Sequence, residues 1–501
     1  MGIKSALSVP FAKLQVKGIK KWSANPIRTQ ERVLRYLLRH GQHTAFGKDH
    51  DLAGVRDYDA FKEAVPIRDY EGFKSYIDRI IEGESNVLWR GKPMYLCKTS
   101  GTTSGSKYIP ITRASMPNHI DAARNALLSY IANTKNHQFV DGKMIFLQGS
   151  PALDISGNIP VGRLSGIVAN HVPAYLRRNR MPSYKTNCIE DWESKVDAIV
   201  EETYDKNMTL ISGIPAWVQM YFEKLIQKTG KATIKEIFPN FSLFVYGGVN
   251  YEPYRSMFEA TIGGKVDSVE LFPASEGFFA FQDTQDEEGL LLVLNAGIFY
   301  EFVKLEHIND ESPERFSLSD VEIGVNYALI LNTNAGLWGY SIGDTVKFVS
   351  KDPYRIIVTG RIKHFISAFG EHVIAEEVES TMQEVIQSEG LAVTEFHVAP
   401  QVTPAEGLPH HEWFIEFKST PTDIRRTEKA LDKILQDKNS YYRDLLEGKV
   451  LSQLRISTVE PGGFVKFMKS RGKLGGQNKI PRLANERTYA NELANFVVDF
   501  D

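Results

Sequence analysis

The sequence predicts an α/β protein, with a large domain built on parallel-rich sheets flanked by helices and a small mobile α+β domain after it. Its 501 residues exceed what one hydrophobic core serves, so at least two domains are expected. Strand-like and helix-like stretches alternate through the middle of the chain, which is typical of parallel strands joined by crossover helices. The pattern changes near residue 361, where short strands and helices of a different order begin.

Apolar runs in the middle of the chain predict strands, and apolar residues recurring every three or four positions predict helices. In chain order we expect a strand at 143–148, a helix over 192–204, a strand at 208–212, a helix over 215–228, a strand at 241–246, a helix over 251–262 and a strand at 266–272. Ligands of such folds gather at the carboxyl ends of the strands, so polar segments at those ends are candidate site segments.

The small domain is expected to begin at residue 361, which divides the chain into 1–360 and 361–501. Apolar spacing predicts a helix over 376–388, strands near 394–399 and 412–418, and further helix between 423 and 446. His410 and His411 lack companions at a metal-ligand spacing, so we expect them to be solvated.

Residues 3–21 place apolar side chains near helical spacing among five lysines. A membrane-surface helix is one interpretation, and a helix packed on the protein's own core is the commoner outcome. Ala6 stands where the myristoylation motif requires Ser or Thr, and an apolar segment typical of a signal peptide is missing. We therefore expect a cytoplasmic protein with no membrane partner.

Composition excludes several classes of function. The formal net charge of -3 gives no sign of a nucleic-acid surface. Two cysteines, Cys97 and Cys188, argue against a disulfide scaffold and against a cysteine-ligated metal.

The segment Thr99–Lys107 has the most distinctive composition of the chain. It reads Thr-Ser-Gly-Thr-Thr-Ser-Gly-Ser-Lys and lies between two apolar runs that predict strands. Its glycines let backbone N–H groups approach an anion, and the hydroxyls and Lys107 add further donors. The spacing differs from a Walker A loop, and an ordinary polar hairpin turn is the alternative interpretation.

Three further segments follow expected strands. Tyr246-Gly247-Gly248-Val249-Asn250 has paired glycines against which a flat ring could lie, although a simple turn would have the same composition. The segment 272–277 carries one carboxylate, Glu276, and a hard cation that bridges phosphates needs only one or two. The segment 339–344 ends in Asp344, which could accept hydrogen bonds from ribose, although Gly-Asp pairs are common in turns.

Two segments of the expected small domain complete the set. Gly360-Arg361-Ile362-Lys363 stands at the domain boundary and suits a hinge. The glycine-rich segment 472–482 contains Lys479 and suits a mobile arm that brings a cation to a reaction centre, with a solvated basic loop as the alternative.

Taken in order, these segments resemble the adenylate-forming (acyl/aryl-CoA ligase, luciferase-like) superfamily, and within it the acyl-acid amido synthetases of the auxin-responsive promoter (GH3-type) family. The resemblance runs from about residue 95 to residue 482, and Thr99–Lys107 is its most specific motif. The chain departs from the family pattern at Ser341, where arginine is usual, and at His372, where many plant members have lysine.

The resemblance implies an ATP-dependent ligase that uses Mg²⁺. It would join a carboxylic acid to AMP, release pyrophosphate, and transfer the acyl group to an amine, typically of an amino acid. Lys479 and Glu276 would be catalytic, with Glu276 also the magnesium ligand, and Arg361 and Lys363 would form the hinge. Nucleotide-binding positions would be Thr99, Ser100, Gly101, Thr102, Thr103, Ser104, Gly105, Lys107, Tyr246, Gly247, Gly248, Val249, Phe272, Ala274, Ser275, Asp344 and Arg361.

Two other functions stay open. One is transfer of the acyl group to coenzyme A, and the other is a nucleotide-binding regulator without turnover. The resemblance suggests a monomer, while the acid, the acceptor and the roles of His171 and His372 are not readable from the sequence. Trp217, Tyr221 and Phe222 border a substrate site or belong to the core.

Overall fold

The computed structural model describes residues 3–99, 107–172, 177–248, 251–362, 365–366, 368–369, 371, 373–402, 404–419, 421–448, 450–472 and 480–498. The chain divides into two compact units. Unit 1 comprises Met1–Val249 and Glu259–Val358, and unit 2 comprises Asn250–Phe258 and Thr359–Asp501. The predicted division into a large domain, 1–360, and a small mobile domain, 361–501, stays a prediction.

Unit 1 is built on one long mixed sheet. In spatial order its strands are β12 (Ile298–Lys304), β13 (Asn326–Thr333), β14 (Tyr340–Lys351), β15 (Tyr354–Arg361), β11 (Leu290–Leu292), β10 (Gly277–Phe281), β9 (Asp267–Ala274), β8 (Leu243–Gly247), β7 (Met208–Ser212), β3 (Lys143–Phe146) and β6 (Arg180–Met181). The strands from β9 to β6 run parallel to one another. Between β9 and the β12 edge of the sheet, antiparallel pairing joins β9 to β10, β10 to β11, β11 to β15, β12 to β13 and β13 to β14.

Helices connect the parallel strands, as the alternating pattern predicts. They are α9 (Tyr184–Asn187), α10 (Trp192–Thr203), α11 (Pro215–Thr229), α12 (Ile234–Ile237) and α13 (Glu252–Ile262). The sequence sets the ends of α11, because Pro215 stands in its first turn and Gly230 closes it in the left-handed region at φ +66°. Each expected strand and helix between residues 143 and 274 is confirmed, and the α/β fold class with it.

A smaller sheet carries the hydroxyl-rich segment. Its strands, in spatial order, are β2 (Lys107–Ile111), β1 (Tyr95–Thr99), β5 (Ile159–Gly162) and β4 (Asp154–Ser156). Strands β1 and β2 are antiparallel, with Thr99 opposite Lys107. The strand–turn–strand expectation is confirmed for both strands, and residues 100–106 between them lie outside the described residues.

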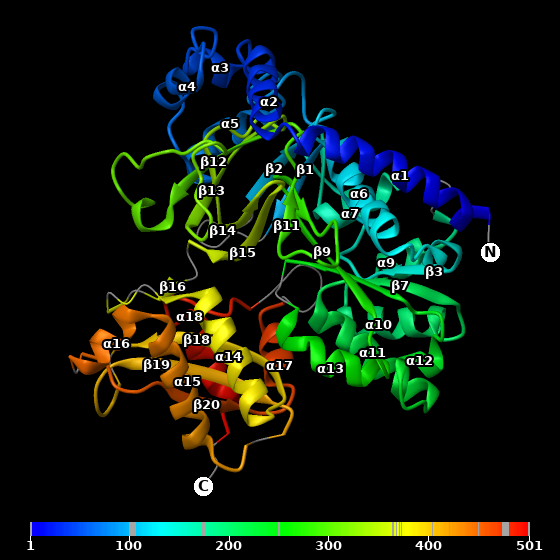
Figure 1. Ribbon diagram of the computed structural model, residues 1–501, viewed down its shortest axis with the longest axis vertical. Coiled ribbons are helices and arrows are strands. Elements are labelled where there is room, and N and C mark those ends of the chain that lie inside the picture. The colour runs from blue at the N-terminus through cyan, green and yellow to red at the C-terminus, as the bar shows by residue number, and fades with distance from the viewer. Residues whose placement is uncertain are drawn as a thin grey trace. The chain divides into compact units, whose positions relative to one another are not determined.

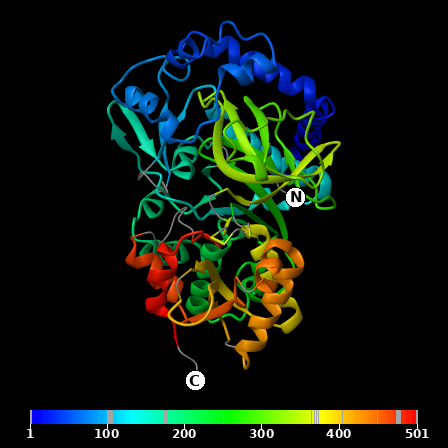
Figure 2. The same cartoon turned by 90° about the vertical axis from the view of Figure 1, so that its left-hand side faces the viewer.

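The remaining helices of unit 1 belong to its N-terminal part and to the segments that connect the smaller sheet. They are α1 (Ile3–Ser23), α2 (Pro26–Gly41), α3 (Ala45–Asp49), α4 (Tyr58–Ala64), α5 (Lys74–Ile81), α6 (Met116–Thr134) and α7 (Leu164–Asn170), with short 3₁₀ turns η1 (Glu71–Phe73), η2 (Gln138–Asp141) and η3 (Leu305–His307). Helix α1 lies along α6 (Figures 1 and 2). In the part of the chain that the structure describes, no helix has the length and apolarity needed to cross a bilayer.

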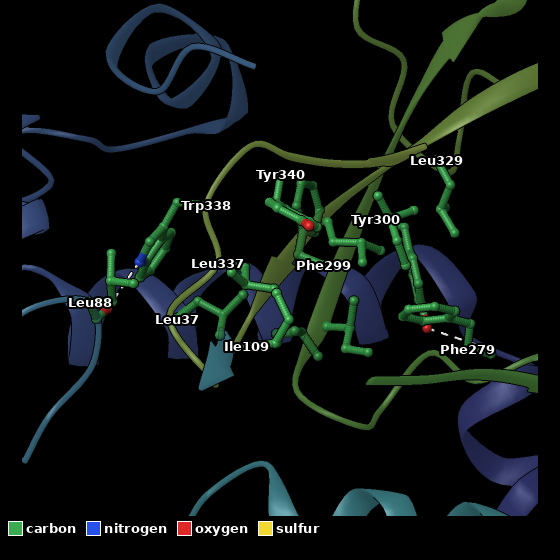
Figure 3. Close-up of a cluster of buried hydrophobic side chains, with 14 of the residues drawn as sticks. Leu37, Leu88, Ile109, Phe279, Phe299, Tyr300, Leu329, Leu337, Trp338 and Tyr340 are labelled. Atoms are coloured by element: carbon green, nitrogen blue, oxygen red, sulfur yellow. Dashed lines mark hydrogen bonds between the residues drawn. The ribbon is translucent and has the colours of Figure 1, made fainter. Parts of the chain in front are cut away.

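The largest core cluster of unit 1 packs the antiparallel part of the long sheet against α2 and the N-terminal segments (Figure 3). The Trp338 indole is fully buried and its Nε1 donates to the Leu88 carbonyl at 3.2 Å. Gly41, the last residue of α2, allows this close packing, because a Cβ there would lie 2.4 Å from the indole ring. The N-terminal helices are therefore part of the folded body of unit 1.

Unit 2 is a small α+β body, as the sequence predicts. Its strands are β16 (Phe365–Ile366), β17 (Val373–Ile374), β18 (Val393–Gln401), β19 (His410–Phe417) and β20 (Arg455–Val459). Its helices are α14 (Ala375–Glu389), α15 (Ile424–Lys438), α16 (Ser440–Glu447), α17 (Gly463–Ser470) and α18 (Thr488–Leu493), followed by the turn η4 (Ala494–Phe496). Strands β18, β19 and β20 form one sheet, whose buried side chains form a core with α14 and α15.

The expectation that His410 and His411 are solvated is wrong. Both are buried, since they begin strand β19 rather than belonging to a loop. His411 Nε2 lies 2.9 Å from Glu371 Oε1, and both side chains are fully buried. This pair is a structural contact inside unit 2.

Candidate active site

The carboxyl ends of β8 and β9 lie side by side. These strands are parallel neighbours, with Gly247 opposite Leu271. Two segments that the sequence singles out, 246–248 and 272–276, are therefore at one edge of the long sheet. This is the edge at which open α/β sheets bind ligands.

The segment after β8 has a backbone that requires glycine. A Cβ at Gly247 would lie 2.4 Å from the Leu271 carbonyl oxygen, and Gly248 has a φ of +74°. Tyr246 is buried and stacks on Phe244, with ring centroids 5.5 Å apart. The predicted positions Val249 and Asn250 lie outside the described residues.

The segment after β9 holds a buried carboxylate. Glu276 stands in the turn between β9 and β10 and is 7% exposed. Its Oε2 accepts a hydrogen bond from Ser275 Oγ at 2.8 Å, and its Oε1 accepts one from the Tyr340 hydroxyl at 3.2 Å. On β9, Phe272 is buried against Phe279, with ring centroids 5.1 Å apart. Ala274 ends that strand and is partly buried.

Cys97 joins the hydroxyl-rich hairpin to this carboxylate. Burial, and to a smaller extent the charge of Glu276, raises the pKa of the Cys97 thiol to about 12. The Leu164 backbone and the Ser275 side chain act on the Cys97 thiol in the opposite direction and lower its pKa by a smaller amount. Cys97 lies two residues before Thr99, so the start of the hydroxyl-rich segment is next to the turn that carries Glu276.

Lys107, on the other strand of the hairpin, is partly buried. Its Nζ lies 5.7 Å from the centroid of the Tyr70 ring, and the Tyr70 hydroxyl accepts a hydrogen bond from the Tyr108 N–H at 2.9 Å. The described strands fix both ends of the predicted phosphate loop. Ser100, Gly101, Thr102, Thr103, Ser104 and Gly105 lie outside the described residues.

Asp344 lies at an irregularity in the long sheet. The pairing of β13 with β14 shifts register between Ala328 and Ile330, and Gly343 has a φ of +88°. A bulge of this kind redirects a side chain relative to the regular pleat. Asp344 is 8% exposed and is four residues along β14 from Tyr340, the residue that donates to Glu276.

The other predicted site residues belong to unit 2. Arg361 is the last residue of β15, and it is exposed. Lys363, His372 and Lys479 lie outside the described residues, so their predicted roles stay predictions.

The sequence-based reasoning missed a buried cationic cluster after β3. Lys195 of α10 is 2% exposed, and its Nζ donates to the carbonyls of Gln148 at 3.0 Å and Asn187 at 2.7 Å. Burial lowers the pKa of Lys195 to about 8, and burial also lowers the pKa of Arg163. Lys195 stands four residues before buried Ile199 on the same face of α10. A lysine among the apolar residues of a helix face is the sequence feature that could have indicated its burial.

Several polar atoms beside this cluster have no hydrogen-bond partner among the described residues. They are Gln148 Nε2, Ser165 Oγ and Asn187 Oδ1. Buried polar groups are normally satisfied, so such atoms mark a place where a polar ligand group or water completes the bonding. Gln148 Nε2 and Ser165 Oγ are donors, so together with the two cations they could hold an anionic group, whereas Asn187 Oδ1 is an acceptor and needs a donor.

His171 has a partner in the structure. Its Nε2 lies 2.9 Å from the Tyr95 hydroxyl at the start of β1, and burial lowers the pKa of the imidazole. Trp217, Tyr221 and Phe222 are all buried, and the Tyr221 hydroxyl lies 2.7 Å from Thr203 Oγ1. All three aromatic residues belong to α11 and are packed in the protein core.

A magnesium ion would fit Glu276 as a single protein ligand. Within the described ranges, no three His, Cys, Asp or Glu side chains come together as a metal cluster. Magnesium that bridges phosphates keeps several waters and needs one or two carboxylates. Glu276, held by Ser275 and Tyr340, meets that requirement.

Comparison with solved structures defines the fold class. The chain is similar to an acyl acid amido synthetase solved in complex with 2,4-DB, with a TM-score of 0.80, 18% identity, and coverage of 97% of this chain and 96% of that chain. A 2-hydroxyisobutyryl-CoA ligase in the postadenylation state matches with a TM-score of 0.60 and 12% identity over 94% of this chain and 92% of that chain. The fold is that of adenylate-forming enzymes.

The chain belongs to the GH3 family. Its residues 15–188 match the GH3 family N-terminal domain, residues 291–361 the central domain and residues 375–488 the C-terminal domain. Similar curated proteins include indole-3-acetic acid-amido synthetase GH3.4 of Arabidopsis thaliana, which is 23% identical over 93% of this chain and 91% of the relative. Jasmonoyl–L-amino acid synthetase JAR4 of Nicotiana attenuata is 21% identical over 91% of this chain and 90% of the relative.

Proposed function

We propose that this protein is an ATP-dependent acyl-acid amido synthetase. It activates a carboxylic acid as an acyl-adenylate, releases pyrophosphate, and passes the acyl group to the amine of an amino acid. The observation that carries the proposal is the buried Glu276 at the carboxyl end of β9, where the Ser275 and Tyr340 hydroxyls donate to its two oxygens. Membership of the GH3 family and the names of its relatives support it.

In the first step, an oxygen of the substrate carboxylate attacks the α-phosphorus of ATP, and the bond to the departing pyrophosphate breaks. This chemistry asks the protein mainly for positioning and for donors to the developing charge. We assign the phosphate-holding donors to Thr99–Lys107, the adenine contacts to 246–249 and 272–275, and the ribose contact to Asp344. Arg361 is proposed to contribute to nucleotide binding.

Glu276 is proposed to bind Mg²⁺ at the phosphates. When bound, the ion would neutralise phosphate charge and orient the phosphoryl group. The Ser275 and Tyr340 hydroxyls hold the two carboxylate oxygens in fixed directions, which prepares Glu276 for one metal ligand position.

In the second step, the amine nitrogen attacks the acyl carbon, the carbon–oxygen bond to AMP breaks, and the amine loses a proton. We propose that Lys479 stabilises the charge around the α-phosphate and the carboxylate during adenylation. The cluster of Arg163 and Lys195 is proposed to hold an anionic group of a substrate. A hinge at Arg361 and Lys363 would let the small domain alternate between the two steps.

The test is acid-dependent exchange of pyrophosphate into ATP. A panel of carboxylic acids, beginning with indole-3-acetic and jasmonic acids because of the named relatives, is offered to the wild type, to Lys479→Ala and to the control Lys433→Ala. Lys433 is an exposed lysine of α15 that pairs with Asp437. We expect exchange with at least one acid and a loss of roughly 100-fold to 1,000-fold in Lys479→Ala alone. Equal exchange by all three proteins would remove the role of Lys479, and no exchange with any acid would favour a regulator without turnover.

A coenzyme A ligase is the second candidate, and the fold shared with 2-hydroxyisobutyryl-CoA ligase favours it as the alternative. Both reactions share the first step, so exchange does not separate them. Mass spectrometry of products, with amino acids and coenzyme A offered in parallel, does. A cytoplasmic location and a monomeric state stay predictions.

A further inference from the structure

The N-terminal part of the chain has an unusual charge. Residues 1–48 contain ten Lys or Arg and a single acidic residue, Glu31, although the whole chain has a formal net charge of -3. These basic residues belong mainly to α1 and α2, which lie close together in unit 1. Such an asymmetry indicates a surface that meets an anionic partner.

Helix α1 buries one face, which includes the large side chain of Ile19, and leaves three other large apolar side chains exposed. Ser5 and Ala12 are fully buried, toward η2 and α6. In contrast, Leu7, Phe11 and Leu14 are 65%, 44% and 68% exposed. The three stand at positions i, i+4 and i+7, so they form one stripe along the helix. We call them the apolar stripe.

Leaving Leu7, Phe11 and Leu14 in solvent forgoes stabilisation that intramolecular packing would provide. Burying a Leu or Phe stabilises by about 1.5–3 kcal/mol, which is more than burying an Ala contributes. The sequence expectation that α1 packs on the protein's own core is correct for one face only. The apolar stripe forms a second face that the described structure leaves in solvent.

A basic groove adjoins the helix. It has a volume of about 720 Å³, and its lining includes Gly18, Lys21 and Trp22 from α1 and Arg28, Arg32 and Tyr36 from α2. Gly18 falls on the same helix face as the apolar stripe, so stripe and groove are continuous. Among the described residues, no acidic side chain lines this groove, and no carboxylate pairs with Lys21, Arg28 or Arg32.

We propose that the apolar stripe and the basic groove together form a docking surface for a bilayer that contains anionic lipids. The apolar stripe enters the interfacial region, and the groove receives a phosphate of a lipid headgroup. Basic amphipathic helices bind membrane surfaces by this combination of apolar burial and charge attraction. The proposal revises the expectation of no membrane partner, and it is independent of the proposed ligase activity.

The charge pattern favours a lipid surface over a second copy of this chain. In a two-fold contact through α1, the lysines of one copy would face those of the other, and like charges oppose such a contact. Lys13, Lys17, Lys20 and Lys21 are exposed on this helix, which contains no acidic residue.

The test is cosedimentation of the full chain with vesicles. One set contains phosphatidylcholine with about 30 mol% phosphatidylserine, the other phosphatidylcholine alone, both at ~0.05 M NaCl so that charge attraction is weakly screened. We expect binding to the anionic vesicles and its loss at ~1 M NaCl. Leu7→Ser/Phe11→Ser/Leu14→Ser should weaken partitioning by on the order of 100-fold. Arg28→Gln/Arg32→Gln should weaken it by about 30-fold.

Matched controls come from the same unit. Ile155→Ser/Ile323→Ser removes two exposed apolar side chains elsewhere, and Lys224→Gln/Lys228→Gln removes two cations spaced four residues apart on α11. Both should bind like the wild type. Absence of binding to anionic vesicles, equal binding to both vesicle sets, or binding unchanged by the apolar triple substitution would each overturn the proposal. Dimerisation through this face, detected by analytical ultracentrifugation, would overturn it as well.

Discussion

At the scale of single residues, the candidate site depends on how Glu276 is held. The carboxylate is almost completely buried, and hydroxyls from its own turn and from β14 donate to its two oxygens. Groups that orient a metal ligand commonly affect metal affinity by 10-fold to 100-fold when they are removed. Tyr340 is thus a positioning residue for the proposed magnesium site.

Tyr340→Phe removes the hydroxyl that donates to Glu276 Oε1 and keeps the aromatic ring in the core. We expect the magnesium concentration for half-maximal pyrophosphate exchange to rise roughly 10-fold, with a smaller change at saturating magnesium. The control is Tyr300→Phe, which removes a buried hydroxyl that donates to the Val293 carbonyl at 3.0 Å, away from Glu276. Equal magnesium dependence in the two variants would contradict the positioning role.

His119 of α6 makes stability depend on pH. It is 4% exposed, and burial lowers its pKa from 6.5 to about 4. Between those pH values the unfolded chain binds more protons than the folded chain. The stability contribution of neutral His119 is therefore complete above about pH 6.5 and is lost as the pH falls toward 4.

The free energy of unfolding of the wild type should fall by roughly 3 kcal/mol from this group over that range, because one pKa unit corresponds to about 1.4 kcal/mol. His119→Leu should show a smaller loss in urea titrations at successive pH values. His307→Gln, at an exposed histidine, should follow the wild type. The same acid sensitivity in His119→Leu and the wild type would exclude His119 as a source.

At the scale of elements, the sequence predicts best where local pattern and packing agree. The alternating strands and helices between 143 and 274 are confirmed, because the longer crossover helices α10 and α11 bury apolar side chains at helical spacing. The antiparallel half of the long sheet was not predicted, since nothing local records which strands pair over long separations. The burial of His411 was predicted wrongly and that of Lys195 was not predicted, for a related reason. The partner of His411 is Glu371 and a partner of Lys195 is the Gln148 carbonyl, and both are distant in the sequence.

The candidate site shows the same division. The hairpin strands, Glu276 and Asp344 were visible as motifs. The hydrogen bond from Tyr340 to Glu276 and the effect of the Glu276 charge on Cys97 join segments far apart in the chain. The register shift at Asp344 was also invisible, because it depends on the pairing of β13 with β14. Motif order therefore indicated the chemistry, and the structure supplied the residues that position it.

The bulge at Gly343 gives a prediction at this scale. Gly343→Ala places a Cβ in open space but forces an L residue to a φ of +88°, which costs about 1–2 kcal/mol. We expect the strain to shift Asp344 and to raise the KM for ATP roughly 10-fold through a lost ribose hydrogen bond. Gly230→Ala is the matched control, because Gly230 has a φ of +66°, equally open surroundings and a place at the end of α11. Both substitutions should lower Tm by a similar amount. An unchanged KM for ATP in Gly343→Ala would contradict the proposed role of Asp344 in ATP binding.

At the scale of the whole molecule, the chain consists of two compact units, each with its own core. The predicted phosphate, adenine and ribose contacts belong to unit 1, whereas Lys479 belongs to unit 2. A ligase with two chemical steps can use such a division by rotating one unit between the steps. If the protein works in this way, some residues are needed for adenylation itself, and others are needed only for the rotation between the two steps.

Lys363→Pro tests that separation. Proline fixes φ and removes a backbone N–H, so it restricts rotation at the proposed hinge, whereas Lys363→Ala removes the side chain and leaves the backbone free. We expect Lys363→Pro to keep acid-dependent pyrophosphate exchange within about 2-fold of the wild type and to lose roughly 10-fold or more in amide formation. Lys363→Ala should retain both activities. A parallel loss of exchange and amide formation in Lys363→Pro would contradict a hinge, since a residue that serves only the rotation between steps leaves adenylation intact.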